Sequence, residues 1–366
     1  MIRILLATVI ALLLTSIFPV RPAAQAAPQR AQPIKAGEVP GRKHIVALPP
    51  RGTFVPPRTP WGDPDLQGTY SNAFENGTPM ERPQQFEGRR IEDVKGDELL
   101  EIKKAAHEQA LIGVGGGLHA PDFFWQTYYE LEKGAQAWLV VDPPDGKIPT
   151  VTPEGRQRAA DRAEARRNSG RGAADSYEDR SLYDRCITRG LPGSMMPAIY
   201  GSHYDITQGP GYVAIRYEMI HETRVIPLSV GPHVGTKIRT YMGDARGHWE
   251  GDTLVVETAN FKIPYQGSSE DLRLIEKFTR YAPGRVGWSV TVNDPKTWVR
   301  PWTFSMPLTM DAEAPVLEYG CHEGNYGLVN ILKGGRADDR KYEEFRRLGF
   351  NIRPPEISTA AEGEER

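Results

Sequence analysis

Cysteine, long hydrophobic runs and an excess of one charge are all scarce in this chain of 366 residues. No segment beyond the N-terminal region is apolar enough to cross a bilayer, which argues against an integral membrane protein. The 45 Lys and Arg against 47 Asp and Glu give no strongly basic balance, so we expect no binding of nucleic acid. No G-x-S-x-G segment occurs, which excludes the nucleophile elbow of an α/β-hydrolase. A small-molecule partner is favoured.

The N-terminus has the parts of a signal peptide. Arg3 is the only charge before an apolar run from Ile4 to Val20, and Ala24-Gln25-Ala26 fits the A-x-A pattern of a cleavage site. We therefore expect residues 1–26 to be removed and the mature protein to be periplasmic or secreted, with no membrane contact after cleavage. A membrane anchor is the alternative, but a run of about 17 residues is at the lower limit for spanning a bilayer.

Export decides what the two cysteines indicate, because disulfides persist outside the reducing cytoplasm. An even number of cysteines in an exported chain predicts a structural disulfide between Cys186 and Cys321. The competing interpretation makes Cys321, which is next to His322, a thiol nucleophile. Oxidation would endanger such a thiol outside the cell, so the disulfide is expected.

The N-terminal half of the chain shows little strand pattern. Nine prolines between Pro28 and Pro64 predict an extended arm over residues 27–64. Residues 65–183 are expected to be irregular and partly helical. Helices are predicted at 93–111 and 154–167, and short strands at 123–129 and 137–141. The glycines after the first helix lack a following Lys-Ser/Thr pair, so they predict a loop and no phosphate-binding cradle.

From Gly211 onward, apolar and polar residues alternate over short segments with turn residues between them. The expected strands span 212–220, 223–228, 237–242, 253–258, 272–280, 288–293, 302–308 and 316–321. About eight antiparallel strands without long helices between them favour a meander that closes into a barrel. This barrel is expected over residues 184–335, and a C-terminal helix with a disordered tail over 336–366.

Four segments carry a resemblance to known families. Gly247–Val256 (GHWEGDTLVV) is similar to the strand–turn–strand of lipocalin-like barrel families. Tyr217–Arg224 (YEMIHETR), Asp294–Trp298 (DPKTW) and Cys321–Gly327 (CHEGNYG) resemble a large uncharacterised family of proteins secreted by soil and marine bacteria. The resemblance implies the fold of the protein and its export, but it implies no activity. The expected fold class is mainly β, a lipocalin-like antiparallel β-barrel with an irregular, partly helical N-terminal region.

The strongest candidate site lies on the first predicted strand and the turn after it. Arg216 and Glu218 share one strand face, while hydrophobic residues occupy the other. If a turn follows Met219, then His221 and Arg224 lie at the same open end of the barrel as Arg216 and Glu218. Glu218 and His221 are candidate general bases, and Arg216 and Arg224 are candidates for binding a substrate anion. A ladder of surface salt bridges is the alternative.

A second candidate site follows Cys321 directly. His322 and Tyr326 are candidate proton donors, which the disulfide would hold in place. Glu323 and Asn325 are candidate substrate-binding groups. The segment is equally consistent with a turn that contains a structural tyrosine. The histidines at 203, 221, 233 and 322 lie at no recognised ligand spacing, so no metal site is predicted.

Two functions follow from these candidates. In the first, the barrel is a periplasmic enzyme without a cofactor that performs acid–base chemistry on a small, partly apolar metabolite in its cavity. Elimination, hydration and isomerisation are reactions of this type. In the second, the same cavity carries an apolar ligand without catalysis. The clustered ionisable groups favour the enzyme, because a carrier has less use for them.

Overall fold

The structure is a computed structural model that describes residues 54–115, 136–198, 200–228, 231–311 and 316–350. The chain divides into a unit of residues 1–35 and a unit of residues 36–366, and the description below concerns the second unit. The predicted signal peptide, most of the predicted arm, the strand at 123–129 and the C-terminal tail lie outside the described residues. Within those residues, no helix combines the length and apolar character needed to span a membrane.

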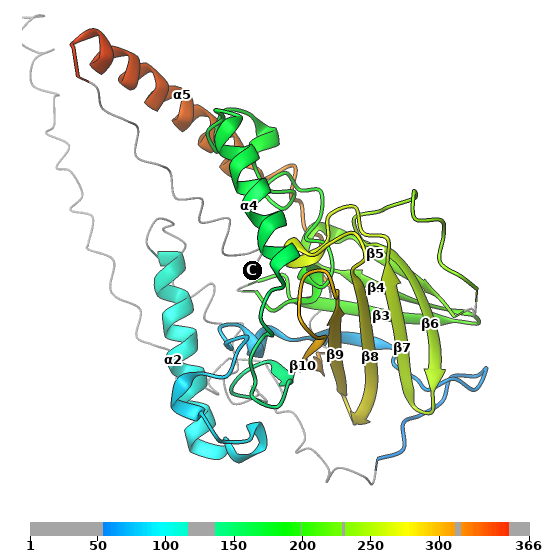
Figure 1. Cartoon of the computed structure of the whole chain (residues 1–366). Coiled ribbons are helices and arrows are strands. Elements are labelled where there is room, and N and C mark those ends of the chain that lie inside the picture. Colours follow the sequence, from blue (N-terminus) through cyan, green and yellow to red (C-terminus); the bar gives the residue numbers. More distant parts are fainter. Residues whose placement is uncertain (1–53, 116–135, 199, 229–230, 312–315, 351–366) are drawn as a thin grey trace, which may run out of the picture. The chain divides into compact units, whose positions relative to one another are not determined.

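Ten strands form one antiparallel sheet (Figure 1). They are β1 Gly68–Ser71, β2 Val140–Asp142, β3 His203–Gly209, β4 Tyr212–Tyr217, β5 Thr223–Pro227, β6 Asp244–Glu250, β7 Thr253–Ala259, β8 Arg273–Ala282, β9 Arg285–Asn293 and β10 Trp302–Met310. The order across the sheet is β5-β4-β3-β1-β10-β9-β8-β7-β6. The short strand β2 pairs with the beginning of β10, and β1 pairs with its end.

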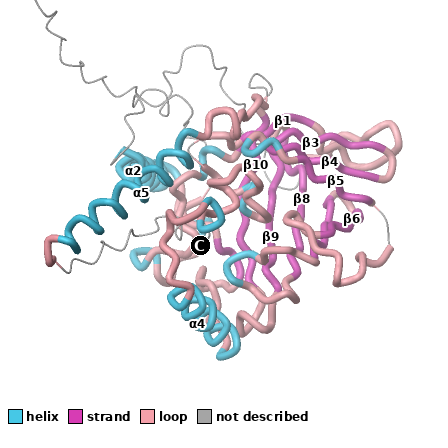
Figure 2. Tube along the Cα trace, turned by 90° about the horizontal axis from the view of Figure 1, so that it is seen from above, coloured by secondary structure: helices cyan, strands magenta, loops and turns pink. Residues whose placement is uncertain are grey.

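The edge strands β5 and β6 approach each other, so the sheet is nearly closed into a barrel. Figure 2 shows the strands from above. Gly247 on β6 lies at this approach, where a Cβ atom would lie 2.8 Å from Ile226 Cγ2 and 2.9 Å from Leu228 Cδ2. A larger residue would force these two side chains to shift, which favours glycine where the edge strands meet.

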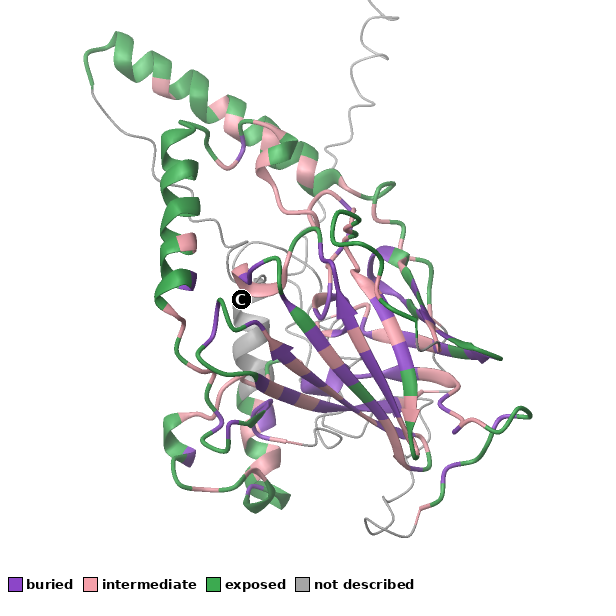
Figure 3. Ribbon diagram, turned by 45° about the vertical axis from the view of Figure 1, so that its right-hand side comes forward, coloured by how far each residue is buried: buried purple, intermediate pink, exposed green. Residues whose placement is uncertain are grey.

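Buried and more exposed residues alternate along the strands (Figure 3). On β4, Val213, Ile215 and Tyr217 are buried, whereas Tyr212 and Arg216 are exposed. The buried faces form one core that is rich in large aromatic side chains, including Trp288, Trp302, Phe278, Phe304, Tyr70 and Tyr204. The mainly β, barrel-like architecture predicted from the period-two pattern is thereby confirmed.

Three α-helices lie within the described residues: α2 Gly96–Gly115, α4 Pro153–Asn168 and α5 Tyr326–Arg347. Helix α4 begins at a proline, and the Thr152 hydroxyl accepts a hydrogen bond from the Gly155 N–H at 3.0 Å. Asn325 caps α5 in the same way, through the Leu328 N–H at 3.0 Å. No side chain of α5 is buried, so this helix adds nothing to the core.

The boundaries of the barrel differ from those predicted. Strand β1 lies between β3 and β10, so a strand from the region expected to be irregular is part of the barrel, which does not begin at residue 184. Segments 237–242 and 316–321 are not strands, and β3 and β6 are strands that the sequence did not reveal. Helix α5 begins at Tyr326, before the predicted residue 336, because Asn325 supplies its cap.

Candidate functional site

The candidate site lies where β3 begins, β4 ends and β5 begins. The chain turns there through a single 3₁₀ turn, Met219–His221, in which Ile220 has φ 63° and His221 has φ 48°. A β-branched residue in the left-handed region is a rare outlier that costs about 1–3 kcal/mol. The Tyr217 N–H donates to the Glu222 carbonyl at 2.9 Å and holds the turn. Strained backbone of this kind clusters at functional sites.

His203 and Glu218 form a hydrogen-bonded pair at this position. The His203 Nδ1 atom lies 2.7 Å from Glu218 Oε2, and the two side chains are 12% and 10% exposed. The Glu218 N–H also donates to the His203 carbonyl at 3.0 Å, which fixes the backbones relative to each other. A carboxylate at Nδ1 sets the tautomer of an imidazole and leaves Nε2 as its basic nitrogen. Among the described residues, Nε2 has no hydrogen-bond partner.

Three tyrosines lie next to the Met219–His221 turn and contact one another. The Tyr183 hydroxyl is 3.4 Å from the Tyr200 hydroxyl and 3.6 Å from the sulfur of Met219, the residue after Glu218. The rings of Tyr200 and Tyr319 stack with their centroids 6.2 Å apart. Burial, and then the Tyr200 hydroxyl, raises the pKa of Tyr319 to about 12 and also raises the pKa of Tyr183. Both hydroxyls are therefore protonated hydrogen-bond donors near neutral pH.

A disulfide fixes the segments that carry these tyrosines. Cys186 and Cys321 are bonded, with their Cα atoms 5.7 Å apart, which confirms the pairing predicted from the sequence. The interpretation of Cys321 as a thiol nucleophile is therefore wrong. The imidazole Nδ1 of His221 lies 2.9 Å from the Tyr319 carbonyl oxygen, and Asn325 Nδ2 lies 3.4 Å from Cys186 Sγ. We call this assembly of residues 183–198, 200–203, 218–222 and 319–321 the rim.

Glu222 is the second carboxylate of the rim. Its Oε2 atom accepts a hydrogen bond from the Thr188 hydroxyl at 2.7 Å. Burial raises the pKa of Glu222, and hydrogen bonds from Thr188 and from the backbone N–H of Arg189 only partly oppose this shift. A partly buried carboxyl group with a raised pKa is a common component of acid–base sites.

Arg224 on β5 and Glu276 on β8 form an ion pair inside the barrel. The guanidinium Nη1 lies 2.5 Å from Oε2 and Nη2 lies 3.2 Å from Oε1, and the side chains are 3% and 0% exposed. Trp288 Nε1 donates to the same carboxylate at 3.2 Å. Burial lowers the pKa of Arg224, but the Glu276 carboxylate outweighs it, so the pKa is raised. The Tyr217 hydroxyl near this pair makes no hydrogen bond of good geometry within the described residues, and burial raises its pKa.

The first predicted cluster is divided between the rim, the interior and the outer surface. Glu218 lies in the rim, and His221, the last residue of the turn, has an exposed side chain that is bound to a backbone carbonyl. Arg216 points outward from β4, and its Nη2 donates to the Val316 carbonyl at 3.4 Å. Arg216 and Glu218 were predicted to share one face of a strand that runs to residue 220, but β4 ends at Tyr217 and Glu218 already belongs to the turn.

Arg224 and the segment after Cys321 also differ from expectation. Arg224 binds Glu276 in the interior, so its guanidinium does not face a substrate at the rim. His322, Glu323 and Tyr326 are exposed, because the chain turns there into α5. No hydrogen bond or ion pair of the described residues joins these three side chains to Glu218 or His221. Asn325 is a helix cap, which is a structural role.

Sequence reasoning missed His203 and Glu276. His203 is the first residue of β3, and the buried residues Tyr204 and Ile206 of this strand follow the period-two pattern. That pattern could have predicted β3 from the sequence. Glu276 stands between Leu274 and Phe278 on an otherwise apolar strand face. A lone charge on such a face indicates a buried partner on another strand, because an unpaired ion is too costly to bury.

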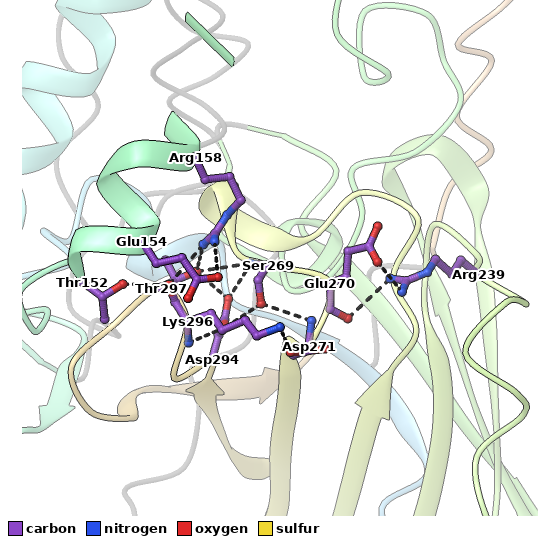
Figure 4. A network of polar contacts seen from close by, with 10 residues as sticks. All are labelled: Thr152, Glu154, Arg158, Arg239, Ser269, Glu270, Asp271, Asp294, Lys296 and Thr297. Carbon is purple, nitrogen blue, oxygen red and sulfur yellow. Dashed lines mark hydrogen bonds and ion pairs between the residues drawn. The ribbon is translucent and has the colours of Figure 1, made fainter. Parts of the chain in front are cut away.

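A separate polar network joins the β9–β10 loop to α4 (Figure 4). The carboxylate of Asp294 accepts hydrogen bonds from the backbone and hydroxyl of Ser269, from the Thr297 hydroxyl at 2.6 Å and from the Lys296 N–H at 3.1 Å. Arg158 of α4 donates to the same Thr297 hydroxyl. Burial raises the pKa of Asp294, but these hydrogen bonds outweigh it and lower the pKa. The Asp294 carboxylate is satisfied by residues of the network, so we assign the network a structural role.

Neither a metal site among the described residues nor a related protein indicates what reaction the candidate site performs. In the part of the chain that the structure describes, no group of three or more His, Cys, Asp or Glu side chains is arranged to hold a metal ion. Comparison with protein-family models, with curated proteins and with solved structures finds no match to this chain. Fold and site together define a nearly closed antiparallel β-barrel with a polar rim that a disulfide braces.

Proposed function

We propose that this protein is an exported acid–base enzyme of the lyase, hydratase or isomerase type, with its active centre at the rim of the barrel. The observation that carries the proposal is the His203–Glu218 pair, with 2.7 Å between Nδ1 and Oε2. Export is proposed from the apolar run Ile4–Val20 and the A-x-A site at its end, and the Cys186–Cys321 disulfide is compatible with it.

In this proposal His203 is the general base. Its Nε2 atom takes a proton from the substrate, while Glu218 accepts the Nδ1–H bond and stabilises the imidazolium that forms. The imidazolium then returns the proton to another substrate atom or to a leaving group, which completes an isomerisation or an elimination. The protonated hydroxyls of Tyr183 and Tyr319 can stabilise negative charge that develops on a substrate oxygen.

The packing of the barrel interior supports catalysis at the rim over carriage of an apolar ligand. A carrier barrel has to leave room for its ligand. Here Trp288, Trp302 and Phe304 are fully buried in one continuous core, and the Arg224–Glu276 pair lies in the same interior. The rim instead offers tyrosine rings beside ionisable groups, which suits a small, partly apolar substrate.

The experiment follows the conversion of small molecules by the purified mature protein. Metabolite extracts are incubated with the protein, and altered compounds are detected by mass spectrometry. We expect His203→Gln to lower turnover by a factor of about 100 or more, since a general base contributes rate factors of this size. Glu218→Gln should also lower turnover and shift its pH profile, because the tautomer and the basicity of His203 are no longer fixed.

His248→Gln is the matched control. His248 also lies next to a carboxylate, with Nε2 3.3 Å from Glu250 Oε1, but both side chains are 55% exposed on β6. This substitution should leave turnover unchanged. A protein that alters no compound, or a folded His203→Gln variant with full turnover, would contradict the proposed function.

A further inference from the structure

The loop that leads into β3 carries two arginines without a carboxylate partner. The guanidinium carbon of Arg185 lies 5.4 Å from the ring centroid of Tyr177, and that of Arg189 lies 5.4 Å from the ring centroid of Tyr183. Within the described residues, neither guanidinium forms an ion pair or donates a side-chain hydrogen bond. Each guanidinium lies over the ring of its aromatic neighbour.

The carboxylates of the rim already have other partners. They are Asp184, which pairs with Arg180; Glu218, which pairs with His203; and Glu222, which accepts from Thr188. Burial also raises the pKa of Glu222, which favours its neutral form. In the part of the rim that the structure describes, the positive charge of Arg189 is therefore left without a neutralising ion pair.

Arg189 belongs to the rim. It lies over the ring of Tyr183, one of the rim tyrosines. The Tyr183 hydroxyl in turn lies 3.6 Å from the sulfur of Met219, the residue after Glu218. A chain of contacts through Tyr183 and Met219 therefore connects the unpaired guanidinium with the Glu218–His203 pair.

The chemistry of this arrangement selects an anion. Stacking on an aromatic face holds the plane of a guanidinium and leaves the N–H groups at its edge free to donate. Two parallel N–H donors match the two oxygens of a carboxylate. The protonated hydroxyls of Tyr183 and Tyr319 are additional neutral donors beside it. A neutral or cationic compound makes no comparable contact.

We propose that Arg189 binds the carboxylate group of a small organic acid and positions it against His203. This inference rests on the proposed function and names the class of its substrate. The remainder of the acid lies against the stacked rings of Tyr200 and Tyr319. Arg189 is a binding residue in this scheme, and the proton transfer itself is left to His203.

The test uses three simple carboxylates, acetate, hexanoate and benzoate, and their amides as neutral counterparts. Binding to the mature protein is measured by ligand-observed NMR titration at low ionic strength. We expect at least one carboxylate to bind about tenfold more tightly than its amide, and Arg189→Gln to weaken that binding about tenfold or more. Arg189→Lys keeps the positive charge but lacks the two parallel N–H donors of the guanidinium. The affinity of this variant for the carboxylate should therefore lie between those of the wild type and Arg189→Gln.

Arg185→Gln is the matched control for this binding experiment. It removes an equally stacked, unpaired arginine, but from Tyr177, which is 54% exposed. Carboxylate affinity should change little. Three results overturn the inference: no carboxylate binds, the amides bind equally well, or both glutamine variants weaken binding to the same extent. The last result would show general electrostatic attraction.

A second variant separates this inference from the proposed function. His203→Gln should lower turnover by a factor of about 100 or more and leave carboxylate binding unchanged, because the anion contacts Arg189. Arg189-dependent binding by a protein that converts no compound would support the carboxylate site and contradict the enzyme. Turnover that His203→Gln lowers and Arg189→Gln leaves intact would support the enzyme and overturn the carboxylate site.

Discussion

Replacing Glu276 by glutamine tests whether the interior ion pair governs the stability of the barrel. Glu276 is 0% exposed and Arg224 is 3% exposed, so water does not compensate for a missing partner. Glutamine keeps the shape of the side chain and an oxygen that can accept from Trp288 Nε1. The substitution therefore leaves a buried cation without a counter-charge. Breaking a buried pair in this way costs about 3–5 kcal/mol of the free energy of unfolding.

Two control variants separate the charge effect from packing. The double variant Arg224→Met/Glu276→Leu removes both ions and the cost of desolvating them, so its stability should be close to that of the wild type. Adding the single variants Arg224→Met and Glu276→Leu completes a double-mutant cycle, which gives the coupling energy of the pair. Tyr217→Phe removes a hydroxyl that makes no hydrogen bond of good geometry, so it should cost less than about 1 kcal/mol.

Urea unfolding of the oxidised protein, followed by tryptophan fluorescence, measures these free energies. The midpoint and the slope are both compared, because an altered slope would signal a change in the surface exposed on unfolding. For a protein of this size the single substitution should also lower Tm by roughly 5 °C. The reasoning is refuted if Glu276→Gln costs less than about 1 kcal/mol, or if the double variant is as unstable as the single one.

Two further predictions concern acid and reduction. The pKa of Asp294 is lowered on folding, so its stabilising contribution is present above the unfolded pKa and is lost as the pH falls through the folded one. Asp294→Asn should cost about 1–3 kcal/mol at neutral pH and flatten the acid decline of Tm, and an undiminished decline in the variant would contradict this. The Cys186–Cys321 disulfide spans a sequence separation of 135, so replacing both cysteines by serine should cost up to about 5 kcal/mol in urea unfolding. Thiol titration of the unfolded, unreduced protein should find no free thiol, and two reactive thiols would refute the bond.

Local pattern predicted two of the hairpin turns of the sheet, but it did not predict every strand beside them. Gly251-Asp252 joins β6 to β7, and Pro283-Gly284 joins β8 to β9, as the turn residues indicated. Strand β6 was missed because Gly247 occupies an inward position where a hydrophobic residue would complete the alternation. Strand β1 has only four residues, too few for a periodic signal. Its place between β3 and β10 depends on pairing with distant segments.

The candidate site was predictable only in part. Glu218 was recognised as a carboxylate near an imidazole, but the imidazole was expected to be His221. The turn Met219–His221 directs His221 to the surface, and the pairing of β3 with β4 brings His203 to Glu218 instead. Sequence proximity favoured the wrong histidine, because residues on paired strands are neighbours regardless of their separation along the chain.

The sequence by itself determined the inward and outward faces of the strands, several of the turns and the partner of each cysteine. These features follow from the period-two alternation of the strands, from the residue types in the turns and from the even number of cysteines. Each of them can be read from neighbouring residues or from a count of one residue type. Tertiary structure alone decided that Arg224 meets Glu276 and that the rim gathers His203, Glu218 and Arg189. A strand pattern states which side of the sheet a residue occupies, but closure of the barrel sets which residues meet across it.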